Sequence, residues 1–138
     1  MRAALIQMPV GTDKGANLAA AARRLREAGA RGADIAVLPE MFCCPYDNAC
    51  FRSYGEADGG EAQTALSALA AELGLYIVGG SLPELEGERV YNTGYVFGRR
   101  GELLAKHRKA HLFDICVEGG AELPGVGRPF PGKCRHHL

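Results

Sequence analysis

A buried strand that ends at a carboxylate is predicted by the stretch Asp34-Ile35-Ala36-Val37-Leu38-Pro39-Glu40-Met41-Phe42. Its apolar run is short and rich in branched side chains, which is typical of a parallel strand covered on both faces. Pro39 has no N–H group to donate, so a central strand cannot continue through it. Glu40 is therefore expected at the carboxyl end of a strand, where open α/β sheets carry their ligand sites.

This position makes Glu40 a candidate general base. Its neighbours Pro39, Met41 and Phe42 are apolar. Partial burial beside them would favour the neutral carboxyl group and raise its pKa toward a value useful for proton transfer. The alternative is a glutamate at a strand end that only reaches solvent, and this stretch alone does not separate the two.

The residues before this strand complete a βαβ unit. Residues 3–8 predict a first strand, which ends at a proline. Thr12 or Asp13 can cap a helix whose apolar residues recur at helical spacing as far as Ala28, where glycines follow. A strand, a helix and a strand joined by short links form a right-handed crossover, so the two strands are expected to be parallel.

Further elements extend this unit. Residues 42–60 show no period and are expected to form a long loop over the sheet edge. Residues 61–73 predict a second helix, and residues 75–81 predict a third buried strand. In that strand, Gly79 and Gly80 would let another backbone or a ligand approach closely, or would mark a bulge.

A hairpin is predicted to follow. Residues 90–97 are rich in β formers, and residues 102–108 can return beside them after a turn, which adds a hairpin to a parallel sheet of the α/β class. The basic residues 106–109 favour a solvated edge or a patch that contacts phosphate. His107 and His111 are four residues apart in a strand and a loop, a spacing that does not converge on one metal ion.

The composition excludes several classes of protein. The 138 residues suffice for one domain with a core, and the 16 basic and 16 acidic side chains give no net charge. Nothing in this balance indicates a nucleic-acid or membrane partner. The apolar run near the N-terminus is too short for a signal peptide, and no stretch approaches the length of a membrane span. We therefore expect a cytoplasmic protein.

The five cysteines are an odd number and contain no C-x-x-C pair. This argues against a disulfide framework and a zinc site, and it favours free thiols in a reducing compartment. Cys43 and Cys44 are adjacent, so their side chains diverge. They are expected to be small buried or half-buried thiols and not a metal site or a redox pair. No cofactor and no metal are expected.

Four separated stretches together carry a family resemblance. They occur in the order seen in the nitrilase (carbon–nitrogen hydrolase) superfamily, and their residues are most similar to those of the omega-amidase branch. The resemblance extends from residue 1 to about residue 117. The stretches are Leu38-Pro39-Glu40-Met41-Phe42 with Cys44-Pro45-Tyr46, Val78-Gly79-Gly80-Ser81-Leu82-Pro83-Glu84, Tyr91-Asn92-Thr93 through Phe97-Gly98, and Lys106-His107-Arg108-Lys109-Ala110-His111-Leu112-Phe113-Asp114.

The resemblance implies a fold and an activity. The fold is a four-layer α-β-β-α sandwich, of which this chain would hold the N-terminal part. The activity is hydrolysis of ω-amides of small dicarboxylic acids, such as 2-oxoglutaramate, through a Glu–Lys–Cys triad. Glu40 matches the general base and Lys109 the catalytic lysine. Glu40 would accept the proton of the thiol, and the ammonium of Lys109 would stabilise the oxyanion.

The resemblance ends abruptly at about Cys116. The family's nucleophile lies in a pattern like Gly-Ile-Cys-Tyr-Asp, which this chain lacks, and neither Cys116 nor Cys134 matches it. We expect residues 1–117 to be the N-terminal part of a carbon–nitrogen hydrolase domain and residues 118–138 to be a divergent tail, rich in Gly and Pro, outside the fold. The sequence therefore predicts a truncated fragment that is inactive as given.

Two other interpretations stay open. Without a second half, one face of the sheet would expose a large apolar surface, which predicts aggregation, self-association as a homo-oligomer or pairing with another chain. The chain would then be a non-catalytic half-domain that interacts with a full-length relative. In the third interpretation, Glu40 and Lys109 are structural residues of an unrelated α/β protein that binds a small molecule.

Overall fold

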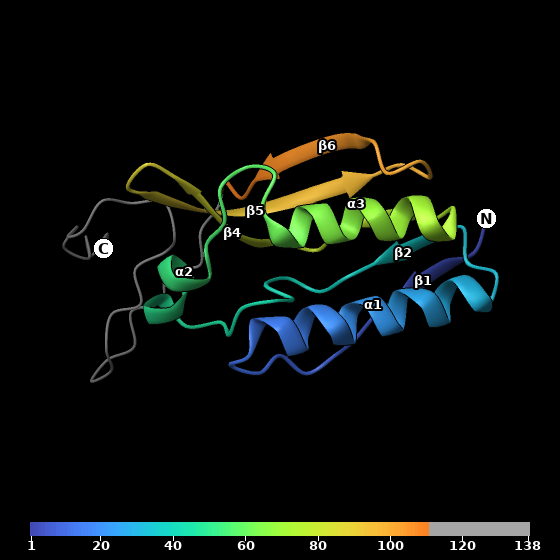
Figure 1. Ribbon diagram of the computed structural model, residues 1–138, viewed down its shortest axis with the longest axis horizontal. Helices are drawn as coiled ribbons and strands as arrows, with labels where there is room; N and C mark the ends of the chain where they lie inside the picture. Colours follow the sequence, from blue (N-terminus) through green and yellow to red (C-terminus); the bar gives the residue numbers. More distant parts are fainter. Residues whose placement is uncertain (111–138) are drawn as a thin grey trace, which may run out of the picture.

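One mixed β-sheet with helices packed on it forms the body of the protein (Figure 1). The computed structural model describes residues 1–110. The α/β class predicted from the sequence is confirmed. The elements in chain order are β1 (Ala3–Leu5), α1 (Lys14–Ala30), β2 (Ile35–Val37), α2 (Asn48–Tyr54), α3 (Glu61–Leu73), β3 (Tyr76–Val78), β4 (Leu82–Glu86), β5 (Arg89–Phe97) and β6 (Leu103–Arg108).

The sheet combines the parallel unit and the hairpin that the sequence predicts. β1, β2 and β3 pair in parallel in that order. β5 pairs antiparallel with β3 through its last residues and with β4 through its first residues, while β6 pairs with β5. β5 therefore joins the parallel strands to the hairpin and brings residues from both parts of the chain together.

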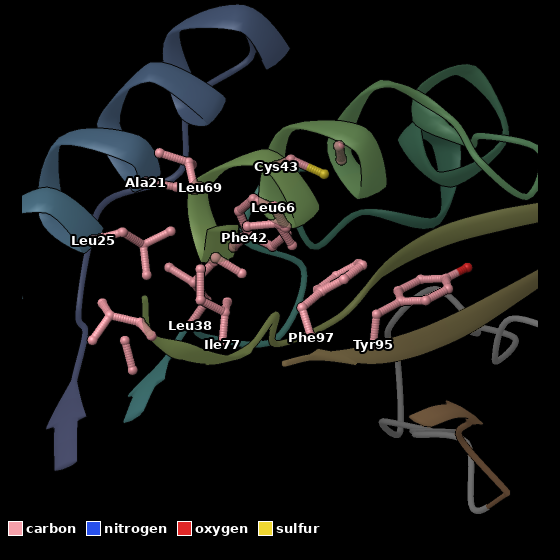
Figure 2. Packing of buried hydrophobic residues seen from close by; sticks show 14 of the residues in the cluster. Ala21, Leu25, Leu38, Phe42, Cys43, Leu66, Leu69, Ile77, Tyr95 and Phe97 are labelled. Atoms are coloured by element: carbon pink, nitrogen blue, oxygen red, sulfur yellow. The ribbon is translucent and has the colours of Figure 1, made fainter. Parts of the chain in front are cut away.

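The two long helices cover the same face of the sheet (Figure 1). α1 begins where Asp13 accepts a hydrogen bond from the N–H of Ala16, so the predicted cap is confirmed. Leu25 of α1 and Leu66 of α3 pack with Ile77 of β3 and with other apolar side chains in one core (Figure 2). This burial of apolar surface is the main term that stabilises the fold.

Two elements were not predicted from the sequence. Residues 42–60 contain α2, a seven-residue helix, where we expected only a loop. Asp47 caps α2 by accepting a hydrogen bond from the N–H of Ala49, and the buried Phe51 packs beside Met41 and Cys44. Two helical turns are too short to display a period, so burial of Phe51 decides this element.

β4 was missed because Pro83 lies in it. A proline is tolerated in a strand where its missing N–H is not needed for the ladder. The predicted strand of residues 75–81 is shorter than expected, because β3 spans only Tyr76–Val78, and β4 begins after the predicted range, at Leu82.

The face of the sheet away from the helices exposes apolar side chains. Leu5 retains 80% of its exposure and Tyr76 39%, whereas Ala36 and Ile77, which point toward the helices, are fully buried. None of the helices formed by residues 1–110 has both the length and the apolar character that a membrane crossing requires.

Candidate functional site

Glu40 lies in a turn that the chain holds in an unusual backbone conformation. Met41, directly after it, has φ of 53°, in the left-handed region that costs most residues about 1–2 kcal/mol. The N–H of Met41 donates to Oγ of Ser81 (3.1 Å), and the N–H of Phe42 donates to the Ser81 carbonyl (3.3 Å). Ser81, between β3 and β4, therefore anchors the turn that presents Glu40.

Gly80 allows the backbone of this turn to pack closely against the segment between β3 and β4. Its φ is +57°, and a Cβ built on it would lie 2.0 Å from the carbonyl oxygen of Pro39 and 2.8 Å from that of Leu38. The sequence left open whether Gly79 and Gly80 admit a backbone, a ligand or a bulge. At Gly80 the neighbour is the backbone that leads directly into Glu40.

Gly80→Ala is expected to destabilise the protein by about 3 kcal/mol, as the sum of a left-handed alanine and a clash with backbone. Gly87→Ala is the matched control. Gly87 also has a positive φ, but no atom lies within 4 Å of its added Cβ, so only the conformational cost remains. Urea unfolding of the two variants measures the difference. Equal losses of stability would show that the approach to Pro39 is unimportant.

Two donors meet one oxygen of Glu40. Nδ2 of Asn92 on β5 donates to Oε1 at 2.7 Å, and Nζ of Lys109 donates to the same atom at 2.9 Å. The N–H of Lys109 donates to the Asn92 carbonyl at 2.8 Å, which ties both donors to the end of the β5–β6 hairpin. Of the hydrogen bonds within residues 1–110, both that reach the Glu40 carboxylate go to Oε1 and none goes to Oε2.

The ion pair is partly open to solvent. The side chain of Glu40 is 46% exposed and that of Lys109 is 34% exposed. Glu40 is thus less desolvated than its apolar sequence neighbours suggested. The hydrogen bond from Lys109 to Glu40 raises the pKa of Lys109, and partial burial opposes this increase. Lys109 therefore stays a cation at neutral pH, in contact with the Glu40 side chain.

The basic cluster of residues 106–109 does not form a free cationic patch. Lys106 and Arg108 point away from Lys109 and bind Glu84, which is 2% exposed. Lys106 also contacts Asp58, and Arg108 also contacts Glu86. These carboxylates neutralise the charges, which removes the basis for a phosphate-contacting patch.

Cys43 and Cys44 are buried free thiols, as the sequence predicts. Burial raises the pKa of each to about 12, so both are protonated at neutral pH. Neither is suited to act as a nucleophile. Cys50 is half-buried.

A thiol reagent at pH 8 is therefore expected to modify Cys50 in the native protein and to leave Cys43 and Cys44 unmodified until the protein is unfolded. Fragment mass spectrometry assigns the labelled residues. In Cys50→Ser, native labelling of this segment should disappear, and labelling after unfolding should remain. Rapid native modification of Cys43 would contradict the burial.

No group of three or more His, Cys, Asp or Glu side chains suited to a metal ion occurs within residues 1–110. The predicted non-nucleophiles Cys116 and Cys134, as well as His111, lie outside the described residues. A hollow of about 540 Å³ lies along β1 and α1, lined by residues that include Arg2, Leu5 and Arg31. Neither Glu40 nor Lys109 lines it, so it is separate from the ion pair.

The structure thus brings together Glu40 and Lys109, both singled out from the sequence although they are 69 positions apart. It adds Asn92 and Ser81, for which the residue pattern alone indicates no role. Both residues lie in stretches that carry the family resemblance, which was the one available signal for them. An asparagine and a serine in β-rich segments are too common to be selected by residue type alone.

A comparison with protein families matches residues 2–133 to the carbon–nitrogen hydrolase family. Among curated proteins, the omega-amidase NIT2 of Danio rerio is 44% identical over 132 residues, which cover 96% of this chain and 48% of that protein. The omega-amidase NIT2 of Mus musculus is 48% identical over 118 residues, which cover 86% of this chain and 43% of that protein. The chain spans about half the length of these relatives.

Solved structures agree with this assignment. Nit3 of Saccharomyces cerevisiae, a member of branch 10 of the nitrilase superfamily, has a TM-score of 0.75 and 38% sequence identity. The match covers 80% of this chain and 44% of Nit3. A mutant amidase of Nesterenkonia from the same superfamily has a TM-score of 0.69 and 28% identity, with coverage of 82% and 44%.

Proposed function

Because the chain belongs to the carbon–nitrogen hydrolase family, we propose that it contributes Glu40 and Lys109 to an omega-amidase-type hydrolase of small ω-amides. One observation carries this proposal. Nζ of Lys109 lies 2.9 Å from Oε1 of Glu40, so a proton acceptor and a cation occupy one site. The names of the relatives, which are omega-amidases, support the substrate class.

The chemistry proceeds through a covalent intermediate. Glu40 accepts the proton of a thiol as its sulfur attacks the amide carbon. The Lys109 ammonium stabilises the oxyanion that forms, and the amide nitrogen leaves as ammonia after it takes up a proton from Glu40. Water then attacks the thioester while Glu40 accepts its proton, which releases the acid and restores the thiol.

The thiol in this scheme is not Cys43 or Cys44, because both are buried and protonated. We propose that it belongs to none of the described residues of this chain. The boundary between residues 1–117 and the tail, and the cytoplasmic location, form part of the same proposal. The free thiols at Cys43, Cys44 and Cys50 support a reducing compartment.

The native protein purified from its source cells provides the test. Its intact mass and its hydrolysis of an ω-amide of a short dicarboxylic acid are measured on the same sample. A mass above the 14.7 kDa of this chain, with release of ammonia from the amide, is expected if a thiol from further sequence completes the site. An inactive protein of higher mass would refute the proposed substrate class.

A second candidate is a half-domain that interacts with a full-length relative. The exposed Leu5 and Tyr76 on the uncovered face of the sheet favour it. A native mass of 14.7 kDa together with co-purification of a longer relative is its expected result. A monomer of this mass that unfolds cooperatively would contradict it.

A further inference from the structure

Glu84 is a buried carboxylate that the proposed reaction does not use. It lies on β4 and is 2% exposed, yet four hydrogen bonds reach it. Thr93 donates through Oγ1 at 2.7 Å, Lys106 through Nζ at 2.7 Å, and Arg108 through Nε at 3.0 Å and Nη2 at 2.7 Å. Both of its oxygens are therefore occupied by charged or hydroxyl donors.

These contacts lie on the opposite face of the sheet from Glu40. Adjacent residues of a strand point to opposite faces. Tyr95 and Phe97 on β5 point to the helix-covered face (Figure 2). Thr93 lies two residues before Tyr95 on the same strand and therefore faces the same way. Asn92, its neighbour, points to the other face and donates to Glu40.

The same relation recurs at the end of β6. Arg108 pairs with Thr93 across the hairpin and binds Glu84. Lys109, the next residue, binds Glu40. Two neighbouring pairs of residues, 92–93 and 108–109, thus each send one side chain to Glu84 and one to Glu40. The two carboxylates are connected through the backbone of these pairs.

We propose that Glu84 is a positioning residue, which holds Asn92 and Lys109 in place to bind Glu40 from the other side of the sheet. This inference rests on the proposed function of Glu40 and Lys109. β6 ends at Arg108, so Lys109 is the first residue beyond the strand. The two-nitrogen contact from Arg108 to Glu84 is the last side-chain anchor before it, and such paired bonds restrict geometry more than one bond does.

Burying the Glu84 carboxylate costs desolvation free energy, and a gain in stability alone does not explain why a charged residue lies at this position. Apolar side chains of similar volume often stabilise a core as well as a buried ion pair does. An apolar residue at position 84 would not orient the guanidinium of Arg108 or the hydroxyl of Thr93. The requirement for orientation favours a carboxylate at this position.

NMR of the full chain tests the positioning directly. The variants are Glu84→Gln and Thr93→Val, and Glu86→Gln is the matched control because it removes an exposed carboxylate from the same arginine. Thr93→Val retains the charge of Glu84, so it also serves if Glu84→Gln does not fold. The readouts are the side-chain amide signals of Asn92 and hydrogen exchange of the Lys109 backbone amide.

In Glu84→Gln and Thr93→Val, the Asn92 signals are expected to move toward those of a free amide. The Lys109 amide is expected to exchange about tenfold faster, the effect of one weakened hydrogen bond of about 1.4 kcal/mol. Glu86→Gln should change neither. Wild-type Asn92 signals in a folded Glu84→Gln or Thr93→Val variant would overturn the proposal. The readouts need no turnover, so absence of amide hydrolysis would refute only the proposed function.

Discussion

Glu40→Gln, made in the longer native protein that supplies the thiol, is expected to reduce kcat for ω-amide hydrolysis by about 10²- to 10⁴-fold, the range that a general base contributes. Glutamine retains the size of the side chain, and its oxygen can still accept from Asn92 and Lys109, so the turn around it should be preserved. What is lost is the ability to take a proton from the thiol and from water. A steady-state assay of ammonia release measures the change.

Lys109→Ala is expected to reduce kcat by about 10²- to 10³-fold, because the oxyanion loses its cation. Glu40 keeps its hydrogen bond from Asn92, so the carboxylate should retain part of its orientation. The double variant should be little worse than either single one, since both residues act in one step.

Glu88→Gln is the control for these variants. Glu88 is exposed, and its side chain makes no hydrogen bond or ion pair within the described part of the chain. Full activity of Glu40→Gln would refute the assignment of the base. If this 138-residue chain is itself active and both variants abolish the activity, Cys116 and Cys134 must be reconsidered as nucleophiles.

Glu84→Gln is expected to lower the free energy of unfolding by about 3–5 kcal/mol at pH 7, the usual cost of removing one partner of a buried ion pair. The amide keeps the shape of the side chain but leaves Lys106 and Arg108 without their carboxylate. Urea unfolding measures the loss. Glu86→Gln is the matched control, because the Glu86 side chain is 58% exposed and its ion pair should contribute little.

The effect of Glu84 should depend on pH. Burial raises the pKa of Glu84, but hydrogen bonds from Arg108, Lys106 and Thr93 outweigh burial and hold it at about 2. In the unfolded chain the pKa of a glutamate is about 4.3. Because the pKa of Glu84 is lower in the folded protein, its ionised carboxylate stabilises the fold at pH values above the pKa of the unfolded chain. This stabilisation is lost as the pH falls toward 2.

The gap in stability between wild type and Glu84→Gln should therefore narrow by about 3 kcal/mol between pH 5 and pH 2. Comparing the two proteins at each pH cancels the other carboxylates. A gap that stays constant over this range would show that Glu84 does not carry the acid-sensitive ion pairs.

Local patterns in the sequence were enough to predict the α/β class, the βαβ unit and the location of Glu40 after β2. These depend on local signals: a branched apolar run, the missing N–H of Pro39, the cap at Asp13 and helical spacing in α1 and α3. Each of these signals depends only on residues that are close together in the sequence, so it can be recognised without the tertiary structure. The resemblance then singled out Lys109.

α2, β4 and the partners of the two carboxylates depend on contacts that form only in the folded chain. α2 depends on the burial of Phe51, and β4 on its pairing with β5, neither of which leaves a period in the sequence. Asn92 and Lys109 meet Glu40 because the β5–β6 hairpin places them there, and alternation along the strands sends Thr93 and Arg108 to Glu84 instead. Contacts between residues distant in the chain depend on register and strand order, which a linear pattern does not contain.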